Sequence, residues 1–306
     1  SAASDVYKRQ IYANMGEMDN KGVDANLEYQ TRIGNKVGLR LFGNLTYSKN
    51  KIVFRDEPAM QYAYQKSEGT RYGEFYGYIA EGYFQSEEEI KKSPRQMREL
   101  APGDIKYKDL NDDGVIDAND QCYLGKSWFP SWSYGMGFNI NYHNFDLALF
   151  FQGVSDVSIM ANGGSIDTGN GDWGASGVGI VPFTGMGLNP SNVITKALDR
   201  WTADNPRADA WYPRMTANAT TNDNNYVNST HWLKDGSYLR LKQASLGYTL
   251  ENKKLMDKGI EYLYFYLSGQ NLLTFSKFKL WDPELGSNGA KYPLSRMVTL
   301  GMRVSF

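Results

Sequence analysis

The acidic segment 109–120 is the part of the sequence whose residue types and spacing best suit chemistry. Side-chain oxygens recur there at the positions that bind Ca²⁺ in twelve-residue calcium loops, and Gly114 stands where such loops turn sharply. The predicted Ca²⁺ ligands are Asp109, Asn111, Asp113, Val115 (through its carbonyl), Asp117 and Asp120. Asp120 replaces the Glu that usually binds in bidentate mode, so the sequence predicts weak affinity. An acidic turn without an ion is the alternative interpretation.

Aromatic rings in irregular, polar stretches form a second candidate site, because such rings can stack on the faces of sugars. The substrate-contact candidates are Trp173, Trp201, Trp211, Tyr212 and Trp281. The alternative is that these rings pack the loops against one another. Neither a G-x-S-x-G nor an H-E-x-x-H motif occurs, and His143 and His231 lie far apart in the sequence. The sequence therefore predicts no catalytic residues.

The elements that must position these residues are long strands with two different faces. In residues 132–142, large apolar side chains alternate with Gly, Ser and Asn, and the alternation resumes over 145–152 after the turn at His143 and Asn144. Side chains of a strand point alternately to the two faces of its sheet, so the pattern predicts a hairpin with one apolar and one small, polar face. Trp and Tyr lie at the ends of the apolar face. This distribution is typical of membrane barrels, which have lipid outside, water inside and aromatic girdles at both interfaces.

The same alternation recurs along the chain and predicts about ten strands in total. Besides the hairpin, the predicted strands are residues 23–32, 37–48, 72–84, 237–250, 260–271 and 296–306, with a further segment at 11–15. Residues 86–100 are predicted to form a short helix capped by Ser86, and residues 193–201 a second short helix. Residues 86–130 and 154–228 are predicted to be long surface loops, because regular alternation is lost there.

Composition and charge exclude several classes of protein. The chain has 306 residues and a formal net charge of −1, so it lacks the basic excess that nucleic-acid binding requires. It has no run of about 18 apolar residues, so no membrane-spanning helix is predicted, and a closed β-barrel is the other structure that can cross a bilayer. The single cysteine, Cys122, cannot form an internal disulfide. Residues 1–10 do not join smoothly to the strands and are interpreted as a doubtful or foreign leader.

Several motifs, in a fixed order, resemble the SusC/RagA family of TonB-dependent outer-membrane transporters. They are residues 102–107 with 109–117, 145–147 with 150–153, 199–202, 235–242, 270–273, 282–284 and the terminal Phe306. The resemblance runs from about residue 14 to the end. It implies an all-β fold, an antiparallel transmembrane β-barrel with long extracellular loops, of which residues 11–306 form a C-terminal portion. The large transporters have 22 strands around a plugged lumen, so the resemblance implies that the plug domain lies outside this chain.

The resemblance also implies a function and partners. The implied function is TonB-dependent uptake of oligosaccharides or peptides across the cell outer membrane of a Gram-negative bacterium, without enzymatic activity. The implied partners are a SusD-like surface lipoprotein, TonB acting through the missing N-terminal region, and outer-membrane lipid. The barrel-assembly machinery is implied to recognise Phe306, and a simple lipid-facing end is the alternative.

Two other functions stay open on the sequence. One is a secreted, calcium-dependent carbohydrate-binding β-sandwich. The other is a secreted glycoside-processing enzyme, which would need two carboxylates facing each other. The apolar strand faces discriminate between them and the transporter, because a sandwich buries these faces between two sheets whereas a membrane barrel leaves them outside.

Overall fold

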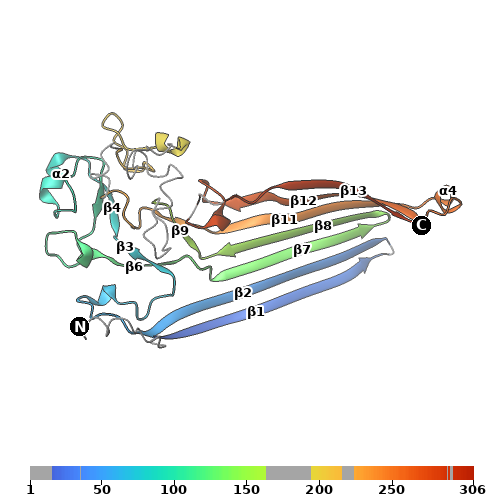
Figure 1. Ribbon diagram of the computed structural model, residues 1–306, viewed down its shortest axis with the longest axis horizontal. Helices are drawn as coiled ribbons and strands as arrows, with labels where there is room; N and C mark the ends of the chain where they lie inside the picture. Colours follow the sequence, from blue (N-terminus) through green and yellow to red (C-terminus); the bar gives the residue numbers. More distant parts are fainter. Residues whose placement is uncertain (1–15, 35, 163–193, 216–223, 288, 290–291) are drawn as a thin grey trace, which may run out of the picture.

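One long antiparallel sheet dominates the computed structural model, which describes residues 16–34, 36–162, 194–215, 224–287, 289 and 292–306 (Figure 1). In spatial order its strands are β1 (Gly16–Ile33), β2 (Val37–Arg55), β7 (Trp132–Tyr142), β8 (Phe145–Ser155), β11 (Tyr238–Leu250), β12 (Tyr262–Ser276) and β13 (Met297–Ser305). All neighbouring pairs are antiparallel. The proposed leader at 1–10 and the segment 11–15 lie outside the described residues.

The two ends of the sheet differ in the length of their connections. At the turn end, tight turns join β1 to β2 and β7 to β8, and a short segment with helix α4 (Lys253–Met256) joins β11 to β12 (Figure 1). His143 accommodates the β7–β8 turn with a φ of 49°, in the left-handed region. At the opposite, loop end, long connections run from β2 to β7, from β8 to β11 and from β12 to β13. Short turns at one end and long loops at the other are typical of outer-membrane barrels.

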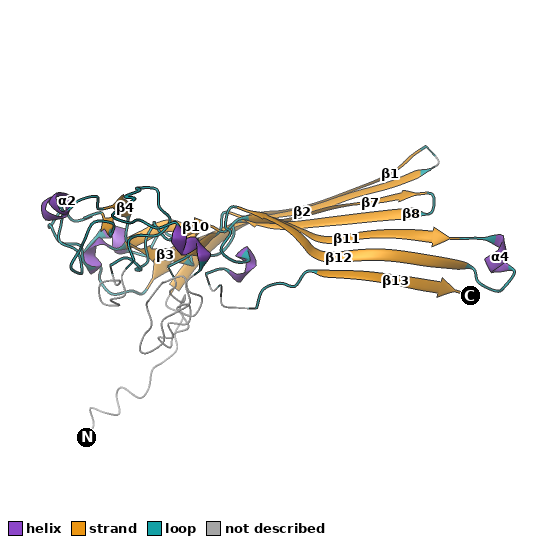
Figure 2. Ribbon diagram, turned by 90° about the horizontal axis from the view of Figure 1, so that it is seen from above, coloured by secondary structure: helices purple, strands orange, loops and turns teal. Residues whose placement is uncertain are grey.

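The long connections fold together into a second region, here called the loop cap, with residues 56–131, 156–162, 194–215, 224–237 and 277–287 (Figure 2). Its strand pairs are β3 (Glu74–Gly77) with β6 (Cys122–Ser127), β4 (Ala80–Tyr83) with β5 (Ile105–Tyr107), and β9 (Ser158–Met160) with β10 (Leu233–Asp235). Its helical elements are η1 (Ala63–Gln65), α2 (Glu87–Lys92), η2 (Ala118–Asp120), η4 (Thr195–Leu198) and η5 (Pro283–Leu285). The segments predicted as surface loops are therefore partly ordered into short strands and turns.

The main apolar core lies inside the loop cap. Its buried members are Phe75, Tyr78, Tyr83, Ile105, Tyr107, Ile116, Met160, Ala197, Trp201, Ala210, Tyr212 and Trp232. A smaller cluster of Ile159, Ala161 and Phe278 joins the β12–β13 connection to it. The cap thus has an apolar core of its own at one end of the sheet.

The prediction of one strand over residues 72–84 is wrong, and so is the count of about ten similar strands. The segment divides into β3 and β4, and neither joins the seven-stranded sheet. Between them, the Tyr78 amide donates to the Asn228 carbonyl and the Thr230 amide donates to the Tyr78 carbonyl. The Tyr78 ring is buried 5.3 Å from that of Tyr107. Burial of this aromatic segment in the cap core outweighs extension of the sheet.

The predicted helix at 86–100 is present in a shorter form. Ser86 caps α2 by accepting from the Glu89 amide at 3.2 Å, and the Glu89 carboxylate accepts from the Gln85 amide. The helix ends before Pro94, which excludes a continuing turn. In the second predicted helix, 193–201, only the single 3-10 turn η4 forms. Across the described residues, helices long and apolar enough to span a membrane are absent.

Candidate functional site

The register of the sheet brings apolar side chains together on one face. Reading across the strands, one row on this apolar face is Leu39, Ile140, Leu147, Leu246, Leu267 and Leu300. Met136 is 48% exposed and Leu300 80% exposed, so these side chains do not lie in a protein core. Among the described residues no second sheet covers the face, and this disfavours the β-sandwich interpretation.

Aromatic rings border the apolar face at both ends. At the turn end, Tyr142, Phe145, Tyr248 and Phe265 occupy adjacent positions on four strands. At the loop end, the Tyr47 and Trp132 rings lie 4.4 Å apart. On β7 the rings of Trp132 and Tyr142 stand at the two ends of an 11-residue strand, which spans roughly 34 Å at about 3.4 Å per residue. A strand tilt of about 40° reduces this to the roughly 25 Å apolar band of an outer-membrane barrel.

The opposite, polar face carries the other alternate residues. The row adjacent to the leucine row is Gln30, Arg40, Asn139, Ala148, Ser245, Ser268 and Thr299. Arg40 donates to Glu28 at 2.8 Å, and the Tyr264 hydroxyl donates to Asp146 at 3.0 Å. A hollow of about 520 Å³ on this face is bordered by Asn139, Asp146 and Arg303. One sheet therefore presents a lipid-compatible surface on one side and a water-compatible surface on the other.

Glycine on the polar face makes room for aromatic rings that lie against the backbone. Phe42 and Phe150 flank Gly137 in the register, and their rings stack with centroids 6.0 Å apart. A Cβ atom at position 137 would clash with the Phe42 ring and the Leu149 carbonyl. The small residues predicted on this face thus hold flat rings against the wall and leave the space beyond them open.

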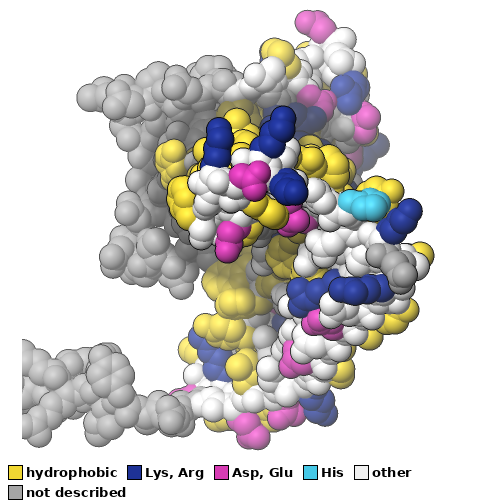
Figure 3. All heavy atoms as spheres, turned by 90° about the vertical axis from the view of Figure 1, so that its right-hand side faces the viewer, with side chains coloured by type: hydrophobic (Ala, Val, Ile, Leu, Met, Phe, Trp, Pro, Cys, Tyr) yellow, Lys and Arg dark blue, Asp and Glu magenta, His cyan; other side chains and the backbone are white. Residues whose placement is uncertain are grey.

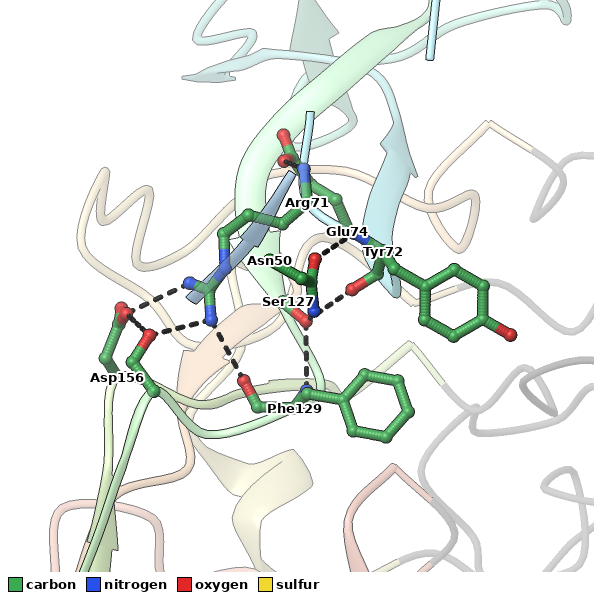
Figure 4. A network of polar contacts seen from close by, with 8 residues as sticks. Asn50, Arg71, Tyr72, Glu74, Ser127, Phe129 and Asp156 are labelled. Atoms are coloured by element: carbon green, nitrogen blue, oxygen red, sulfur yellow. Dashed lines mark hydrogen bonds and ion pairs between the residues drawn. The ribbon is translucent and has the colours of Figure 1, made fainter. Parts of the chain in front are cut away.

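A polar network joins the sheet to the loop cap at the loop end (Figure 4). The Arg71 guanidinium donates to Asp156 at 3.0 Å, to Ser131 at 2.8 Å and to the Phe129 carbonyl at 3.2 Å. The Ser131 hydroxyl also donates to Asp156. Burial acts to raise the pKa of the Asp156 carboxyl, but the Ser131 hydroxyl and the Arg71 guanidinium lower that pKa below its ordinary value. Ser131 precedes β7 and Asp156 follows β8, so Arg71 fixes the cap to both strands of this hairpin.

A second junction joins two of the motifs that carry the family resemblance. Arg240 in β11 is only 1% exposed, and it donates to Asp282 at 2.6 Å and lies 3.4 Å from Glu284. The neighbouring Lys242 lies 3.8 Å from Glu284. The motifs 235–242 and 282–284 are therefore paired segments that hold the β12–β13 connection against the wall.

Motifs within the loop cap are also held in place by ion pairs and close packing. Asp104 is fully buried and pairs with Arg214 at 2.7 Å. A Cβ atom at Gly103 would clash with the Trp201 ring, which explains the Gly at this position of the motif. The partners Arg71, Asp156 and Arg214 were not predicted, since a single charged residue in a loop carries no pattern that identifies its partner.

The aromatic candidates for substrate contact lie mostly within the cap core. Trp201 and Tyr212 are buried there, and Trp211 packs against both apolar clusters. Trp281 is partly exposed, and its indole donates to the Gly286 carbonyl at 2.8 Å. Trp173 lies outside the described residues. The structure thus places four of the five rings where they pack the loops together, and direct substrate contact stays a prediction.

The acidic loop 109–120 is closed by its own hydrogen bonds. Gly114, with a φ of 80°, donates its amide to Asp109 at 2.8 Å, and Asp113 accepts from the Val115 amide at 2.9 Å. Asp120 is fully buried and accepts from the Leu110 and Asp117 amides at 2.7 and 2.8 Å. Oδ1 of Asp109 has no hydrogen-bond partner.

This geometry leaves the calcium prediction untested. Within the described residues, no three His, Cys, Asp or Glu side chains are grouped so as to hold a metal ion. Asn111 and the Val115 carbonyl complete the predicted ligand set. The Asn111 side chain donates to Asp113 at 2.9 Å and accepts from the Asp113 amide at 3.1 Å. Binding of Ca²⁺ would require the Asn111 and Asp113 side chains to turn from these contacts.

Phe306 follows the last strand at the turn end and is 84% exposed. Strand β13 pairs only with β12 among the described residues, so it forms one edge of the sheet, and β1 forms the other. Recognition of Phe306 by an assembly machinery stays a prediction.

The sheet is wide and antiparallel, with one lipid-compatible face, one polar face, short turns at one end and folded loops at the other, and these features are typical of the walls of outer-membrane β-barrels. No protein-family model matches the chain. The chain is 26% identical over 321 residues to TonB-dependent receptor P3 of Formosa agariphila, and 28% identical over 319 residues to TonB-dependent receptor P26 of the same organism. Each match covers 96% of this chain, which spans 29% and 30% of the two receptors.

Solved structures agree in fold. The RagAB peptide transporter superposes with a TM-score of 0.66 at 20% identity, and the RagAB peptide importer in its 'closed-closed' state with a TM-score of 0.68 at 22% identity. Each match covers 96% of this chain and 30% of the solved chain. The predicted resemblance to TonB-dependent transporters and the predicted all-β fold are therefore confirmed. The relatives are receptors and transporters, in agreement with the prediction that the chain is not an enzyme.

Proposed function

We propose that this chain forms part of the barrel wall of an outer-membrane transporter that imports oligosaccharides or peptides with energy from TonB. The observation that carries the proposal is the pair of adjacent rows in one sheet, leucine and isoleucine on one face and amides, hydroxyls and charges on the other. Because the apolar row is exposed and is not buried against a second sheet, the arrangement suits a sheet with lipid on one side and water on the other. The similar TonB-dependent receptors and the RagAB peptide importer support it.

The edges of the sheet support a larger assembly. Unpaired backbone groups on an edge strand are costly in hydrocarbon, so β1 and β13 would each pair with a further strand in a closed barrel. Exposed Phe306 at the turn end suits recognition by the barrel-assembly machinery.

The loop cap supports a partner on the outside of the cell. It is folded around its own core and is fixed to the sheet by Arg71 and Arg240, so it offers a stable platform for a SusD-like lipoprotein lid. The similar RagAB importer is described in 'open-open' and 'closed-closed' states. A lid that opens and closes over such a platform fits those descriptions.

The proposal is tested with the full-length protein in the outer membrane. We expect slower gel migration after heating than before, which is the signature of a detergent-resistant barrel, and uptake of a labelled oligopeptide or oligosaccharide that stops when TonB is removed. A protein recovered from the aqueous phase of a detergent partition, with no change in migration on heating, would contradict the proposal. Co-purification of the lipoprotein encoded beside the gene tests the lid.

A further inference from the structure

The apolar face carries an unusual group of positive charges at its loop end. In the β1–β2 register Lys21 lies directly opposite Lys49, and the next outward pair is Asp19 with Lys51. Val23 and Tyr47, two residues nearer the turn end, lie opposite each other on the apolar face. Because side chains alternate, Lys21 and Lys49 lie on that same face. Both lysines are exposed.

No described residue neutralises the positive charges of Lys21 and Lys49. Like charges directly opposite each other in a sheet destabilise it. Within the described part of the chain, no carboxylate comes within ion-pair distance of Lys21, Lys49 or Lys51, and Asp19 opposite Lys51 does not do so either. On the polar face of the same two strands the charges are matched, because Arg40 and Glu28 form an ion pair at 2.8 Å. Among the described residues the two lysines are unmatched, and one anion could neutralise both.

The height of the pair along the strand indicates which anion. Tyr47 packs on Trp132 at the loop-end border of the apolar face, where the rings of a barrel mark the level of the lipid headgroups. Lys49 is two residues beyond Tyr47, or roughly 7 Å along the strand. A long Lys side chain at this height lays its methylene groups on apolar surface and places its ammonium among the headgroups. The same order recurs on β12, where exposed Phe275 is followed by exposed Lys277.

We propose that Lys21 and Lys49 bind the phosphate group of an anionic lipid headgroup in the membrane leaflet at the loop end. The site rests on the proposed membrane orientation of the sheet. The two ammonium groups share one phosphate, which converts a repulsive pair into a bridged pair and binds one lipid beside the β1–β2 hairpin. Lys51 lies one step further outward, opposite Asp19, so this step of the ladder adds no net charge.

Calorimetry on the full-length protein in a neutral detergent tests the site. The probes are dihexanoyl phosphatidic acid, dihexanoyl phosphatidylcholine and inorganic phosphate. We expect the phosphatidic acid to bind and the other two to bind far more weakly. The double variant Lys21→Gln, Lys49→Gln should weaken the binding about 25-fold, because each Lys near an anionic lipid surface contributes about fivefold. Lys49→Arg should retain binding, since the charge is kept.

The matched control is Lys254→Gln on α4 at the turn end, which should leave the affinity for phosphatidic acid within about twofold of wild type. Equal binding by the double variant, or equal binding of phosphatidylcholine, would overturn the proposal. Equally tight binding of inorganic phosphate would assign the site to a free anion and would also overturn it. Heat-modifiable migration is recorded for every variant. A wild-type barrel that shows the shift but binds no phosphatidic acid refutes the lipid site alone, whereas loss of the shift in wild type refutes the proposed function.

Discussion

The sheet and the loop cap use apolar side chains in opposite ways. In the cap, Trp232, Tyr107 and Ile105 are buried in a core, as in any water-soluble domain. In the sheet, Leu41, Leu246 and other large apolar side chains are exposed in continuous rows. A soluble protein rarely exposes such a large contiguous apolar surface. The difference fits the proposed surroundings of the two regions, with water around the cap and lipid against the apolar face of the sheet.

Seen along the strands from the turn end, the charged side chains are unevenly distributed. Charged side chains gather around the turns and on α4, where the sheet leaves the membrane in the proposed orientation (Figure 3). The mean hydropathy of −0.54 therefore averages over two regions with different requirements. In the described part of the chain no helix is long and apolar enough to cross a membrane.

The largest expected effect is on the cap core. Trp232 is fully buried, and its indole donates to the Asn225 carbonyl at 2.7 Å. Trp232→Ala should destabilise the cap by about 3–5 kcal/mol, because it removes a large buried side chain and leaves a cavity. Hydrogen exchange should show lost protection in the cap and unchanged protection in the sheet. Leu198→Ala, at an exposed site of the cap, should change stability by less than about 0.5 kcal/mol.

A charge placed on the lipid side of the sheet should have the next largest effect. Leu149 and Asn139 lie near the middle of the β7–β8 hairpin, on the apolar and polar face respectively. Leu149→Arg should make folding into lipid vesicles less favourable by about 2–4 kcal/mol, because the guanidinium would lie in hydrocarbon. Asn139→Arg should cost less than about 1 kcal/mol. Equal costs at the two positions would remove the distinction between the faces.

The stability of the cap should depend on pH through His231. Nε2 of His231 lies 3.1 Å from the Trp211 carbonyl, which can only accept, so this nitrogen carries the hydrogen. Burial, with the nearby Lys234, lowers the pKa of His231 from 6.5 to about 4. The unfolded state therefore binds more protons between pH 6.5 and 4, and stability falls by up to about 3 kcal/mol as the pH falls through that window.

Thermal unfolding of the cap between pH 7 and 4 measures this dependence. His231→Gln should remove most of it. His143→Gln changes the other histidine, which is exposed in the β7–β8 turn, and should leave the dependence intact. A flat profile for wild type would show that His231 is not held neutral by the cap.

The junction between the two regions should show a smaller effect. Asp156→Ala removes the carboxylate that accepts from Arg71 and Ser131, and should cost about 1–2 kcal/mol because the pair is partly exposed. The folded-state pKa of Asp156 lies below 3.8, so its contribution is present above pH 3.8 and is lost as the pH falls through the folded pKa. Hydrogen exchange should show residues 129, 131 and 156 of wild type closed at pH 5 and opening only as the pH falls through the folded pKa of Asp156, below 3.8. Asp156→Ala should show that opening already at pH 5.

The smallest expected effect is that of Ca²⁺ on the loop 109–120. The predicted site should bind Ca²⁺ in the millimolar range in calorimetry on the full-length protein, and Asp113→Ala should abolish the binding. No heat with wild-type protein at millimolar Ca²⁺ would show that these carboxylates serve only the backbone of the turn. Asp120→Ala should destabilise the loop in either case, since two buried amides lose their acceptor.

The same contrast explains how much the sequence could predict. The strands of the sheet were predictable because apolar and polar side chains alternate between its two faces. This alternation gives the sequence a period of two, as in β7 and β13. The fold of the cap was not predictable, because Tyr78 and Trp201 pack against residues from distant segments. The sequence around them has no regular alternation of apolar and polar residues. The motifs 235–242 and 282–284 were recognised by resemblance, but their pairing through Arg240 and Asp282 required coordinates.

The faces of the sheet can be tested most directly at Met136 and Asn139, three residues apart on β7 and on opposite faces. Each is changed to Cys in the full-length protein carrying Cys122→Ser, and labelled with a nitroxide in lipid vesicles. The label of Met136→Cys should be accessible to oxygen and shielded from a water-soluble nickel complex, and the label of Asn139→Cys should show the reverse. Equal access of the nickel complex to both labels, or the opposite pattern, would contradict the assignment of lipid to one face and water to the other.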